Sequence, residues 1–305
     1  MWGARRSGGA TVKRCRVLFA AVLVLVSTAA AATEVRLVDD AGRSVTLKQP
    51  AKRIISLTPH LTELLFAAGA GSRIVGTVEF SDYPPAARSI ARVGDSAQLD
   101  LERIVALRPD LILAWQGGSS RRQLDKLLQL GIPVFFNAPH QLADIARSIE
   151  QFGSMAGTEA QALPAAQAFL VRLAQLRRRY AGRTPVRVFY QIWDKPLMTV
   201  NGEHLIGEAI TACGGVNVFA ALPLLTPTVG WEAAVAADPQ LIALSGRPAD
   251  AERDFARWRR FVQVSAVRQG HIATIDGDLI GRMGPRFVQG ASALCDAVER
   301  ARQAP

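Results

Sequence analysis

An eleven-residue pattern occurs twice in this chain, 130 positions apart. Glu102-x-x-Val105-Ala106-x-x-Pro109-x-Leu111-Ile112 is matched at every specified position by Glu232-x-x-Val235-Ala236-x-x-Pro239-x-Leu241-Ile242. In each copy a short helical pattern ends before a proline and continues into an apolar run, which predicts a helix, a turn and a buried parallel strand. An acidic residue opens the helix both times. The repeat therefore predicts two related lobes that present equivalent carboxylates.

Two roles fit the repeated glutamates, Glu102 and Glu232. Carboxylates presented in the same way on two lobes could both contact one partner. Alternatively, each carboxylate only complements the partial positive charge at the start of its helix, an effect worth roughly 0.3–1 kcal/mol. The repeat alone leaves both roles open.

The N-terminus has the pattern of a secretory signal peptide. Basic residues precede an apolar run at 17–26, and small residues at 27–32 offer a cleavage site. The apolar run is shorter than the roughly 20 residues that a membrane-spanning helix needs, and no later segment supplies one. We therefore expect residues 1–32 to be removed, together with Cys15, and the mature chain to be exported and soluble.

Charge and cysteine usage narrow the function classes. Loss of the five basic residues of the signal peptide lowers the formal net charge from +10 to +5, and no aromatic-basic motif is present, so we do not expect nucleic-acid binding. Cys213 and Cys295 remain, and an even number of cysteines in an exported protein favours a disulfide, worth roughly 4 kcal/mol in the chain-entropy model. A reactive or metal-binding pair is the alternative, although neither cysteine has a second ligand nearby in the sequence.

Apolar runs alternate with helical patterns on both sides of one long amphipathic segment. The expected strands are 54–57, 74–78, 111–114, 134–136, 186–192, 241–244 and 272–275. The expected helices are 61–69, 101–107, 120–130, 142–156, 204–213, 231–237 and 289–302. This alternation predicts an α/β fold of two Rossmann-like βα lobes, at 33–157 and 183–305, joined by a single long helix within 158–182. Its apolar stripe is expected at Leu163, Ala166, Leu170, Leu173, Leu176 and Tyr180.

Aromatic residues follow several predicted strands. Phe80 and Tyr83 come after the strand at 74–78, Trp115 after 111–114 and Trp193 after 186–192. Residues at the carboxyl ends of parallel strands line the crevice of an α/β protein. Any one of these rings could be ordinary packing. Together, they predict flat apolar walls that suit a large, rigid ligand.

Motifs for catalysis are missing from the sequence. It has no Gly-x-Ser-x-Gly elbow, His-Glu-x-x-His helix, phosphate-binding loop or dinucleotide fingerprint. His60 is the only histidine at a predicted strand exit. It could form a hydrogen bond or ligate a metal in the cleft, or be a solvated or helix-capping residue. We expect no enzymatic activity, no cofactor and no bound metal.

Several longer motifs follow one another in a recognisable order. They are Ile54-Ile55-Ser56-Leu57-Thr58-Pro59 with Thr62-Glu63-Leu64, Ser81-Asp82-Tyr83-Pro84-Pro85, Ala114-Trp115-x-Gly117-Gly118, Cys213-Gly214-Gly215-x-Asn217-x-Phe219, and finally Pro285-Arg286 and Leu294-Cys295. In order and spacing the chain resembles the periplasmic cobalamin-binding proteins of ABC-type vitamin importers. These belong to the class III, helical-hinge family of periplasmic substrate-binding proteins.

The resemblance implies a periplasmic monomer that captures cobalamin between its lobes and delivers it to the permease dimer of an inner-membrane ABC transporter. Cobalamin would be the transported ligand and not a cofactor. Glu102 and Glu232 match the family's permease-docking glutamates, and Cys213 with Cys295 matches its disulfide. From the strand exits and the resemblance together, the expected ligand-binding residues are Pro59, His60, Phe80, Trp115, Trp193, Asp278, Leu279, Ile280, Gly281 and Arg282.

The chain also departs from the family pattern. Ser96 and Thr226 stand at positions of tryptophans, and Phe80 replaces a tyrosine, which implies an altered affinity or a different corrinoid. Haem is an alternative ligand on the same fold and would require a side chain such as His60 or Tyr83 on its iron. A ferric siderophore would require several arginines in the cleft. A metal-dependent periplasmic enzyme is the remaining alternative.

Overall fold

The computed structural model describes residues 1–4, 34–95, 98–118 and 120–303. Most of the expected signal peptide, residues 1–32, lies outside these ranges, and so does Ser96. Within the described ranges, none of the helices combines the length and the apolar character needed to cross a bilayer.

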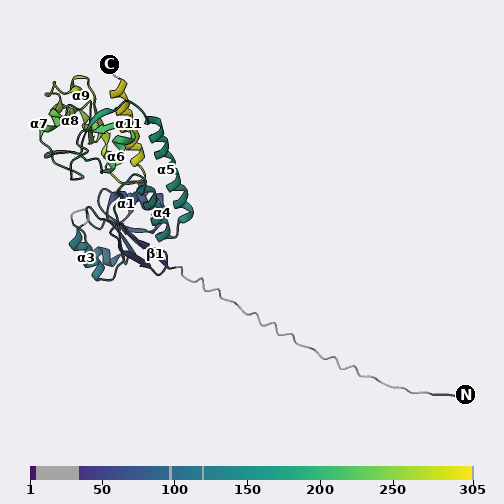
Figure 1. Cartoon of the computed structure of the whole chain (residues 1–305). Coiled ribbons are helices and arrows are strands. Elements are labelled where there is room, and N and C mark those ends of the chain that lie inside the picture. The colour runs from purple at the N-terminus through teal and green to yellow at the C-terminus, as the bar shows by residue number, and fades with distance from the viewer. Residues whose placement is uncertain (5–33, 96–97, 119, 304–305) are drawn as a thin grey trace. The chain divides into compact units, whose positions relative to one another are not determined.

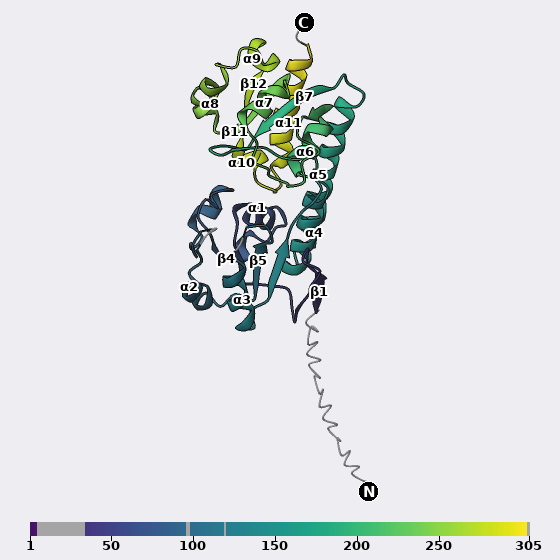
Figure 2. The same cartoon turned by 60° about the vertical axis from the view of Figure 1, so that its left-hand side comes forward.

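The N-terminal lobe is built on a four-stranded parallel sheet with helices on both faces (Figures 1 and 2). In spatial order the strands are β4 (Ile74–Thr77), β3 (Ile54–Ser56), β5 (Leu111–Trp115) and β6 (Val134–Asn137). The helices are α1 (Pro59–Ala67), α2 (Leu101–Ala106), α3 (Arg121–Gln129) and α4 (Asp144–Ala156), with 3₁₀ turns η1 (Gly71–Arg73) and η2 (Pro85–Ser89). Leu111 and Leu113 pack with α1 and α4, whereas Ile112 and Ala114 pack with α2 and α3. Because both faces are covered, the strands are mostly apolar and do not alternate between apolar and polar residues.

The C-terminal lobe repeats this topology. Its strands, in spatial order, are β10 (Gly215–Asn217), β7 (Val186–Gln191), β11 (Leu241–Gly246) and β12 (Ile272–Asp276), all parallel. Its helices are α6 (Leu205–Ala212), α7 (Trp231–Ala236), α8 (Ala251–Trp258), α9 (Ser265–Arg268), α10 (Gly277–Ile280) and α11 (Phe287–Gln303), with a 3₁₀ turn η3 (Pro248–Asp250). In both lobes the first strand lies between the second and the third, and the fourth is at the edge. The predicted pair of βα lobes is thereby confirmed.

The repeated sequence forms the same local structure in each lobe. Arg108 and Asp238, 130 positions apart, both adopt a left-handed backbone, with φ of 46° and 40°, directly after α2 and α7. Arg53 donates to the carbonyl of Leu107 at 3.0 Å, and Arg187 donates to that of Asp238 at 3.2 Å. Arg53, directly before β3, and Arg187, in β7, thus each bind a carbonyl left open after a helix. The strands β5 and β11 that follow occupy equivalent places in their sheets.

Helix α5 (Glu159–Tyr180) lies along both lobes, against α4 on one side and α6 and α11 on the other (Figure 2). A Cβ on Gly153 would lie 2.2 Å from the Cβ of Ala162, so the close approach of α4 and α5 requires glycine there. This contact turns Ala162 inward and leaves Leu163 54% exposed, which corrects the predicted stripe at its first position. At the other end of α5, Tyr180 donates to Asp296 of α11 at 3.0 Å.

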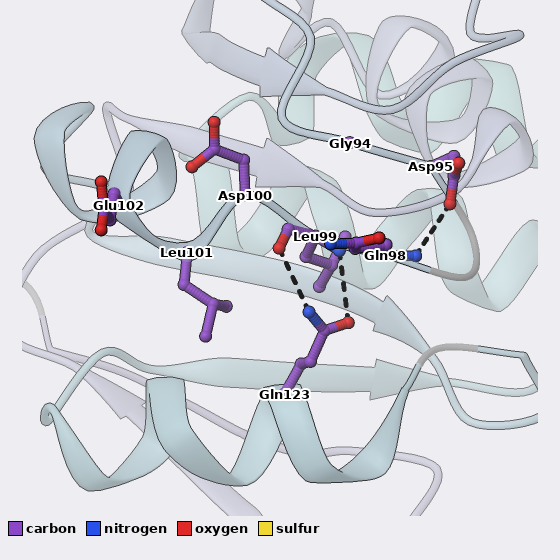
Figure 3. Close-up of a pocket in the computed structure, with 8 residues that line it drawn as sticks. All are labelled: Gly94, Asp95, Gln98, Leu99, Asp100, Leu101, Glu102 and Gln123. Atoms are coloured by element: carbon purple, nitrogen blue, oxygen red, sulfur yellow. Dashed lines mark hydrogen bonds between the residues drawn. The ribbon is translucent and has the colours of Figure 1, made fainter.

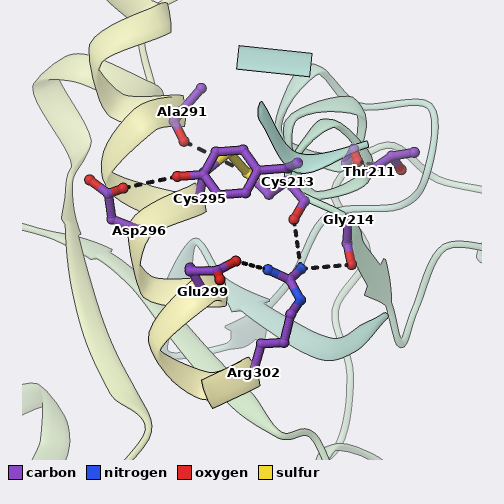
Figure 4. The surroundings of a disulfide bond; sticks show 10 residues. Thr211, Cys213, Gly214, Ala291, Cys295, Asp296, Glu299 and Arg302 are labelled. Carbon is purple, nitrogen blue, oxygen red and sulfur yellow. Dashed lines mark hydrogen bonds and ion pairs between the residues drawn. A yellow bond between two sulfur atoms is a disulfide. The ribbon is translucent and has the colours of Figure 1, made fainter. Parts of the chain in front are cut away.

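A disulfide joins Cys213, after α6, to Cys295 in α11, with a Cα–Cα distance of 4.7 Å and a sequence separation of 82 (Figure 4). The predicted disulfide is confirmed. Arg302, which follows Cys295 further along α11, donates to the carbonyls of Cys213 at 2.9 Å and Gly214 at 3.3 Å. The C-terminal helix is therefore fixed to the rest of its lobe by a covalent and a polar contact.

Two short antiparallel hairpins were not predicted. They are β1 (Val35–Val38) with β2 (Ser44–Leu47), and β8 (Trp193–Asp194) with β9 (Leu197–Met198). The first hairpin is fixed by Asp39, whose carboxylate accepts hydrogen bonds from Arg43 and from the backbone N–H of Phe136 in β6. The second begins at Trp193, directly after β7, and places this tryptophan at the carboxyl edge of the sheet.

Candidate functional site

A cleft of about 670 Å³ lies between the lobes at the carboxyl ends of the strands. It is lined by Phe80, Asp82, Gln191, Ile192, Trp193, Asp194, Ser245, Gly246, Arg247, Asp250, Arg253, Gly277, Asp278 and Arg282. The C-terminal lobe contributes the residues that follow β7, β11 and β12, and the N-terminal lobe contributes the loop after β4. Strand ends at the point where strand order reverses are the usual ligand site of an open α/β sheet.

Two of the predicted aromatic residues expose their rings in this cleft. Phe80 is 76% exposed and Trp193 is 62% exposed. The indole N–H of Trp193 donates to the carbonyl of Lys195 at 3.1 Å, which fixes the orientation of the ring. Phe80 has a φ of 63°, in the left-handed region that is costly for a bulky residue. Packing does not account for a strained and exposed phenylalanine.

Trp115 and His60 lie together in the N-terminal lobe and do not line the cleft in this structure. Trp115 is half-buried at the end of β5, and its ring lies so close to Gly118 that a Cβ there would be 2.3 Å away. His60, in the first turn of α1, meets this ring edge to face at a centroid distance of 5.8 Å. Its neighbour Pro59 begins the helix and is half-buried.

His60 is only 5% exposed, so the alternative of a solvated histidine is wrong. Its Nδ1 lies 3.1 Å from Thr58 Oγ1. Burial, together with the nearby positive charge of Arg282, lowers the pKa of His60 to about 3. The imidazole is therefore neutral at physiological pH, because the surrounding apolar groups disfavour its charged form.

The predicted ligand-binding segment 278–282 divides between the cleft and the core. Asp278 and Arg282 line the cleft, Gly281 is exposed and Leu279 is half-buried. Ile280 is only 1% exposed and packs in the core against Gly290 of α11, so its place among the cleft residues is corrected. Residues 278–280 belong to the short helix α10 and Gly281 and Arg282 follow it, and one helical turn cannot direct all of its side chains to one side.

Beneath the cleft, a buried carboxylate from one lobe binds two arginines from the other. Glu63 in α1 has a side chain that is 1% exposed. Its Oε2 accepts from Arg286 Nε at 2.8 Å, and its Oε1 accepts from Arg286 Nη2 at 2.7 Å and from Arg282 Nη1 at 3.1 Å. Arg282 also contacts Asp278 at 2.8 Å and Asp82 at 3.4 Å. The hydrogen bonds to Glu63 raise the pKa of Arg286 above its ordinary value.

The sequence motifs contained Glu63 and Arg286, but no role was predicted for either. The guanidinium of Arg286 also lies over the ring of Tyr83, 3.9 Å from its centroid. One cation thus connects the buried acid to the aromatic loop of the N-terminal lobe. The available signal was the presence of an acid in the helical stretch 61–66, whose other residues are apolar apart from Thr62.

The charges that line the cleft are nearly balanced. Its lining contains four aspartates (Asp82, Asp194, Asp250 and Asp278) and three arginines (Arg247, Arg253 and Arg282), which gives a formal charge of −1. Arg247 pairs with Asp250 at 2.9 Å, and Asp194 pairs with Arg257 outside the lining at 2.7 Å. The cleft therefore offers no excess of positive charge to an anion. No group of three or more histidine, cysteine, aspartate or glutamate side chains is arranged to hold a metal among the residues that the structure describes.

Glu102 and Glu232 are exposed in the first turns of α2 and α7. Glu102 borders a surface hollow of about 600 Å³ that Figure 3 shows in close-up. Its other lining residues are Gly94, Asp95, Gln98, Leu99, Asp100, Leu101 and Gln123. Gln123 of α3 bonds the N–H of Leu99 at 3.2 Å and its carbonyl at 3.1 Å, and Asp100 caps α2 through the N–H of Arg103 at 2.9 Å. This lining belongs to one lobe and has no aromatic ring among its described members, so the interlobe cleft is the better site for a flat ligand.

Comparisons with known proteins agree with the fold. The family model described as periplasmic binding protein matches residues 54–279. The vitamin B12-binding protein of Vibrio parahaemolyticus is 34% identical over 255 residues, covering 84% of this chain and 92% of the relative. That of Yersinia pestis is 37% identical over 247 residues, covering 81% and 86%.

Solved structures show the same similarity. The periplasmic vitamin B12 binding protein BtuF of Vibrio cholerae has a TM-score of 0.77 and 35% identity, covering 84% of this chain and 99% of that one. A periplasmic heme-binding protein from Pseudomonas aeruginosa has a TM-score of 0.73 at 23% identity, covering 83% and 94%, and this likeness shows the fold alone. With the two-lobed fold, the long helix between the lobes and the matched family model, this chain belongs to the periplasmic binding protein family.

Proposed function

We propose that this protein captures cobalamin in the interlobe cleft and delivers it to the permease of an ABC transporter. It works as a periplasmic monomer, performs no chemistry and carries cobalamin as cargo, not as a resident cofactor. The observation that carries the proposal is the pair of exposed rings, Phe80 and Trp193, at the carboxyl ends of strands in a cleft between two lobes. Relatives that are 34–37% identical over most of the chain are named vitamin B12-binding proteins.

Affinity comes mainly from removing flat apolar surface from water. Stacking on Phe80 and Trp193 buries ligand and protein surface together, at about 25 cal/mol per Å² of apolar area. The corrin ring carries neutral carboxamides, which both donate and accept hydrogen bonds. The paired charges of the rim, such as Arg282 with Asp278, and the polar side chains Gln191 and Ser245 supply the matching groups.

The site argues against haem and against an anionic siderophore. A haem iron needs a histidine or tyrosine that it can reach from the cleft, but His60 is buried against Trp115 and neither His60 nor Tyr83 is among the residues that line the cleft. A siderophore anion needs surplus cations, whereas the lining has a formal charge of −1. Neither ligand matches the cleft as well as a neutral, flat corrinoid does.

The cleft presents fewer rings than the family pattern. Thr226, at a position of tryptophan in the resembling family, is exposed in the segment between β10 and α7 and offers no aromatic face. We propose that this protein holds cobalamin more loosely than a member with both tryptophans, or that it accepts a different corrinoid. A side-by-side comparison of corrinoids addresses this point.

Delivery uses the repeated acids. Glu102 and Glu232 stand at equivalent positions of the two lobes, on α2 and α7, and both are exposed. A permease dimer that offers the same cationic site twice would contact both, one from each subunit. Neither acid lines the interlobe cleft, so docking and ligand capture occupy separate surfaces.

Calorimetric titration of the purified mature chain with cyanocobalamin, cobinamide and haem tests the proposal. We expect one cyanocobalamin per chain and no ligated haem. Trp193→Ala should weaken cyanocobalamin binding, while Leu130→Ala, a comparably exposed apolar residue after α3, should not. A Soret band of ligated haem together with no response to cyanocobalamin would reject cobalamin in favour of haem.

A further inference from the structure

Glu63 forms the most buried charged contact between the lobes among the ion pairs of the described residues. Its side chain is 1% exposed, while those of Arg282 and Arg286 are 14% and 15% exposed. The acid comes from α1 in the N-terminal lobe, and both arginines come from the segment between α10 and α11 in the C-terminal lobe. Three hydrogen bonds to one carboxylate therefore cross from lobe to lobe.

A carboxylate buried to this degree depends on its partners. Desolvation of a charge is unfavourable unless opposite charges and hydrogen bonds compensate it. Arg286 supplies the fork-to-fork geometry that fits a carboxylate best, because its Nε and Nη2 reach one oxygen each. Separating the lobes would leave Glu63 unpaired in an apolar environment, so this contact favours one relative position of the lobes.

The same carboxylate orients a residue of the cleft. Arg282 lines the cleft and donates through Nη1 to Glu63 and through Nη2 to Asp278. With both ends of its guanidinium bound, the side chain is held in a single direction. Without Glu63, Arg282 would retain only contacts to the exposed acids Asp278 and Asp82.

We propose that Glu63 is a positioning residue for ligand binding: it fixes the separation of the lobes through Arg286 and orients Arg282 in the cleft, without touching the ligand. The proposal rests on the function proposed above. It explains why an acid occupies a buried position of α1 where an apolar side chain would satisfy the core. A cleft held at one width loses less conformational freedom when a rigid ligand enters, which favours binding.

Glu63→Gln tests the proposal, because it removes the charge and keeps the size of the side chain. The matched control is Asp39→Asn, which neutralises another fully buried acid of the same lobe that binds an arginine, Arg43, within that lobe. Spin labels on Gln129→Cys in α3 and Gln269→Cys after α9, both exposed and in different lobes, report the interlobe distance in the protein without ligand. Calorimetry with cyanocobalamin reports the affinity.

We expect Glu63→Gln to broaden the distance distribution and to raise the Kd for cyanocobalamin on the order of tenfold, as for the loss of one charge-assisted hydrogen bond. Asp39→Asn should leave the distance distribution and the Kd unchanged, even if it lowers the melting temperature as much as Glu63→Gln does. A Glu63→Gln protein with an unaltered distance distribution or an unaltered Kd overturns the proposal, and so does equal broadening in Asp39→Asn.

Arg286→Lys provides a second measurement if Glu63→Gln does not fold. Lysine keeps the charge but cannot form the two parallel bonds of a guanidinium. It should broaden the distance distribution relative to the wild type, and a distribution as narrow as that of the wild type would count against the proposal. Failure of the wild type to bind cyanocobalamin would count against the proposed function alone, because the distances are measured without ligand.

Discussion

Replacing Phe80 separates ligand contact from fold stability at a single residue. A phenylalanine ring presents about 200 Å² when free, so 76% exposure leaves roughly 150 Å² available. A flat ligand covers one face, about 75 Å², which is worth about 2 kcal/mol at about 25 cal/mol per Å². Phe80→Ala and Phe80→Gly should therefore each raise the Kd for cyanocobalamin about thirtyfold, measured by calorimetry.

The two substitutions should differ in stability although they agree in binding. Phe80 has a φ of 63°, and a left-handed backbone costs a residue with a Cβ about 1–2 kcal/mol. Glycine avoids this cost, although its greater freedom in the unfolded chain offsets about 0.5–1 kcal/mol. We expect Phe80→Gly to be about 1 kcal/mol more stable than Phe80→Ala in urea unfolding.

Leu163→Ala is the control, because Leu163 is an exposed apolar residue on α5 outside the cleft. It should leave the Kd for cyanocobalamin unchanged. If Phe80→Ala bound cyanocobalamin as the wild type does, the ring would not be a ligand contact. If the alanine variant were instead the more stable of the two, the left-handed backbone at this position would not be a source of strain.

Three further predictions follow from other parts of the molecule. Glu102→Ala or Glu232→Ala should weaken binding to the reconstituted permease by about 2–5 kcal/mol while cyanocobalamin affinity stays as in the wild type; a loss of ligand affinity in either variant contradicts the separation of docking from capture. Replacing Cys213 and Cys295 together by serine should lower the free energy of unfolding by about 4 kcal/mol, because the disulfide closes a long loop; urea unfolding at unchanged stability would oppose this. Burial lowers the pKa of His204 to about 4 in the folded state, so its contribution is complete above about pH 6.5 and is lost at about 1.4 kcal/mol per pH unit as the pH falls towards 4. His204→Asn keeps an N-cap acceptor for the N–H of Ile206 and should flatten this part of the stability profile in urea unfolding from pH 7 to 4; an unchanged slope would mean that His204 does not titrate there.

The parts of the fold that were predictable are those in which periodicity and burial agree. The strands β5 and β11 are continuous apolar runs because helices cover both faces of each sheet, and the repeat marks the turn before each of them. The left-handed residues Arg108 and Asp238 show that the repeat extends to the backbone. Sequence similarity between the halves thus identified the equivalent places of Glu102 and Glu232.

The parts that were missed are short or depend on tertiary contacts. The β1–β2 hairpin has only four residues in each strand, and its acid Asp39 acts through Arg43 and β6, which no local pattern contains. The apolar stripe of α5 was predicted to begin at Leu163 but begins at Ala162, because Gly153 on α4 has no side chain and leaves room for Ala162 to pack inward. Leu163 is the better apolar residue by composition, and its exposure is decided by the neighbouring helix.

The ion pairs between the lobes were only partly predictable from the sequence. Glu63 lies in the mostly apolar stretch 61–66, and a buried acid requires a cation as its partner. The local sequence therefore predicts that Glu63 has a cationic partner but does not identify it, because Arg282 and Arg286 are 219 and 223 positions away. The predicted cleft reduces the number of possible partners, because an acid in the helix that follows the first strand of one lobe faces the loops at the cleft side of the other lobe. Segment 278–282 was predicted to line the cleft, and it contains Arg282, with Arg286 shortly after it. The need of Glu63 for a cation in one lobe and the presence of these arginines in the other therefore indicate the same interface.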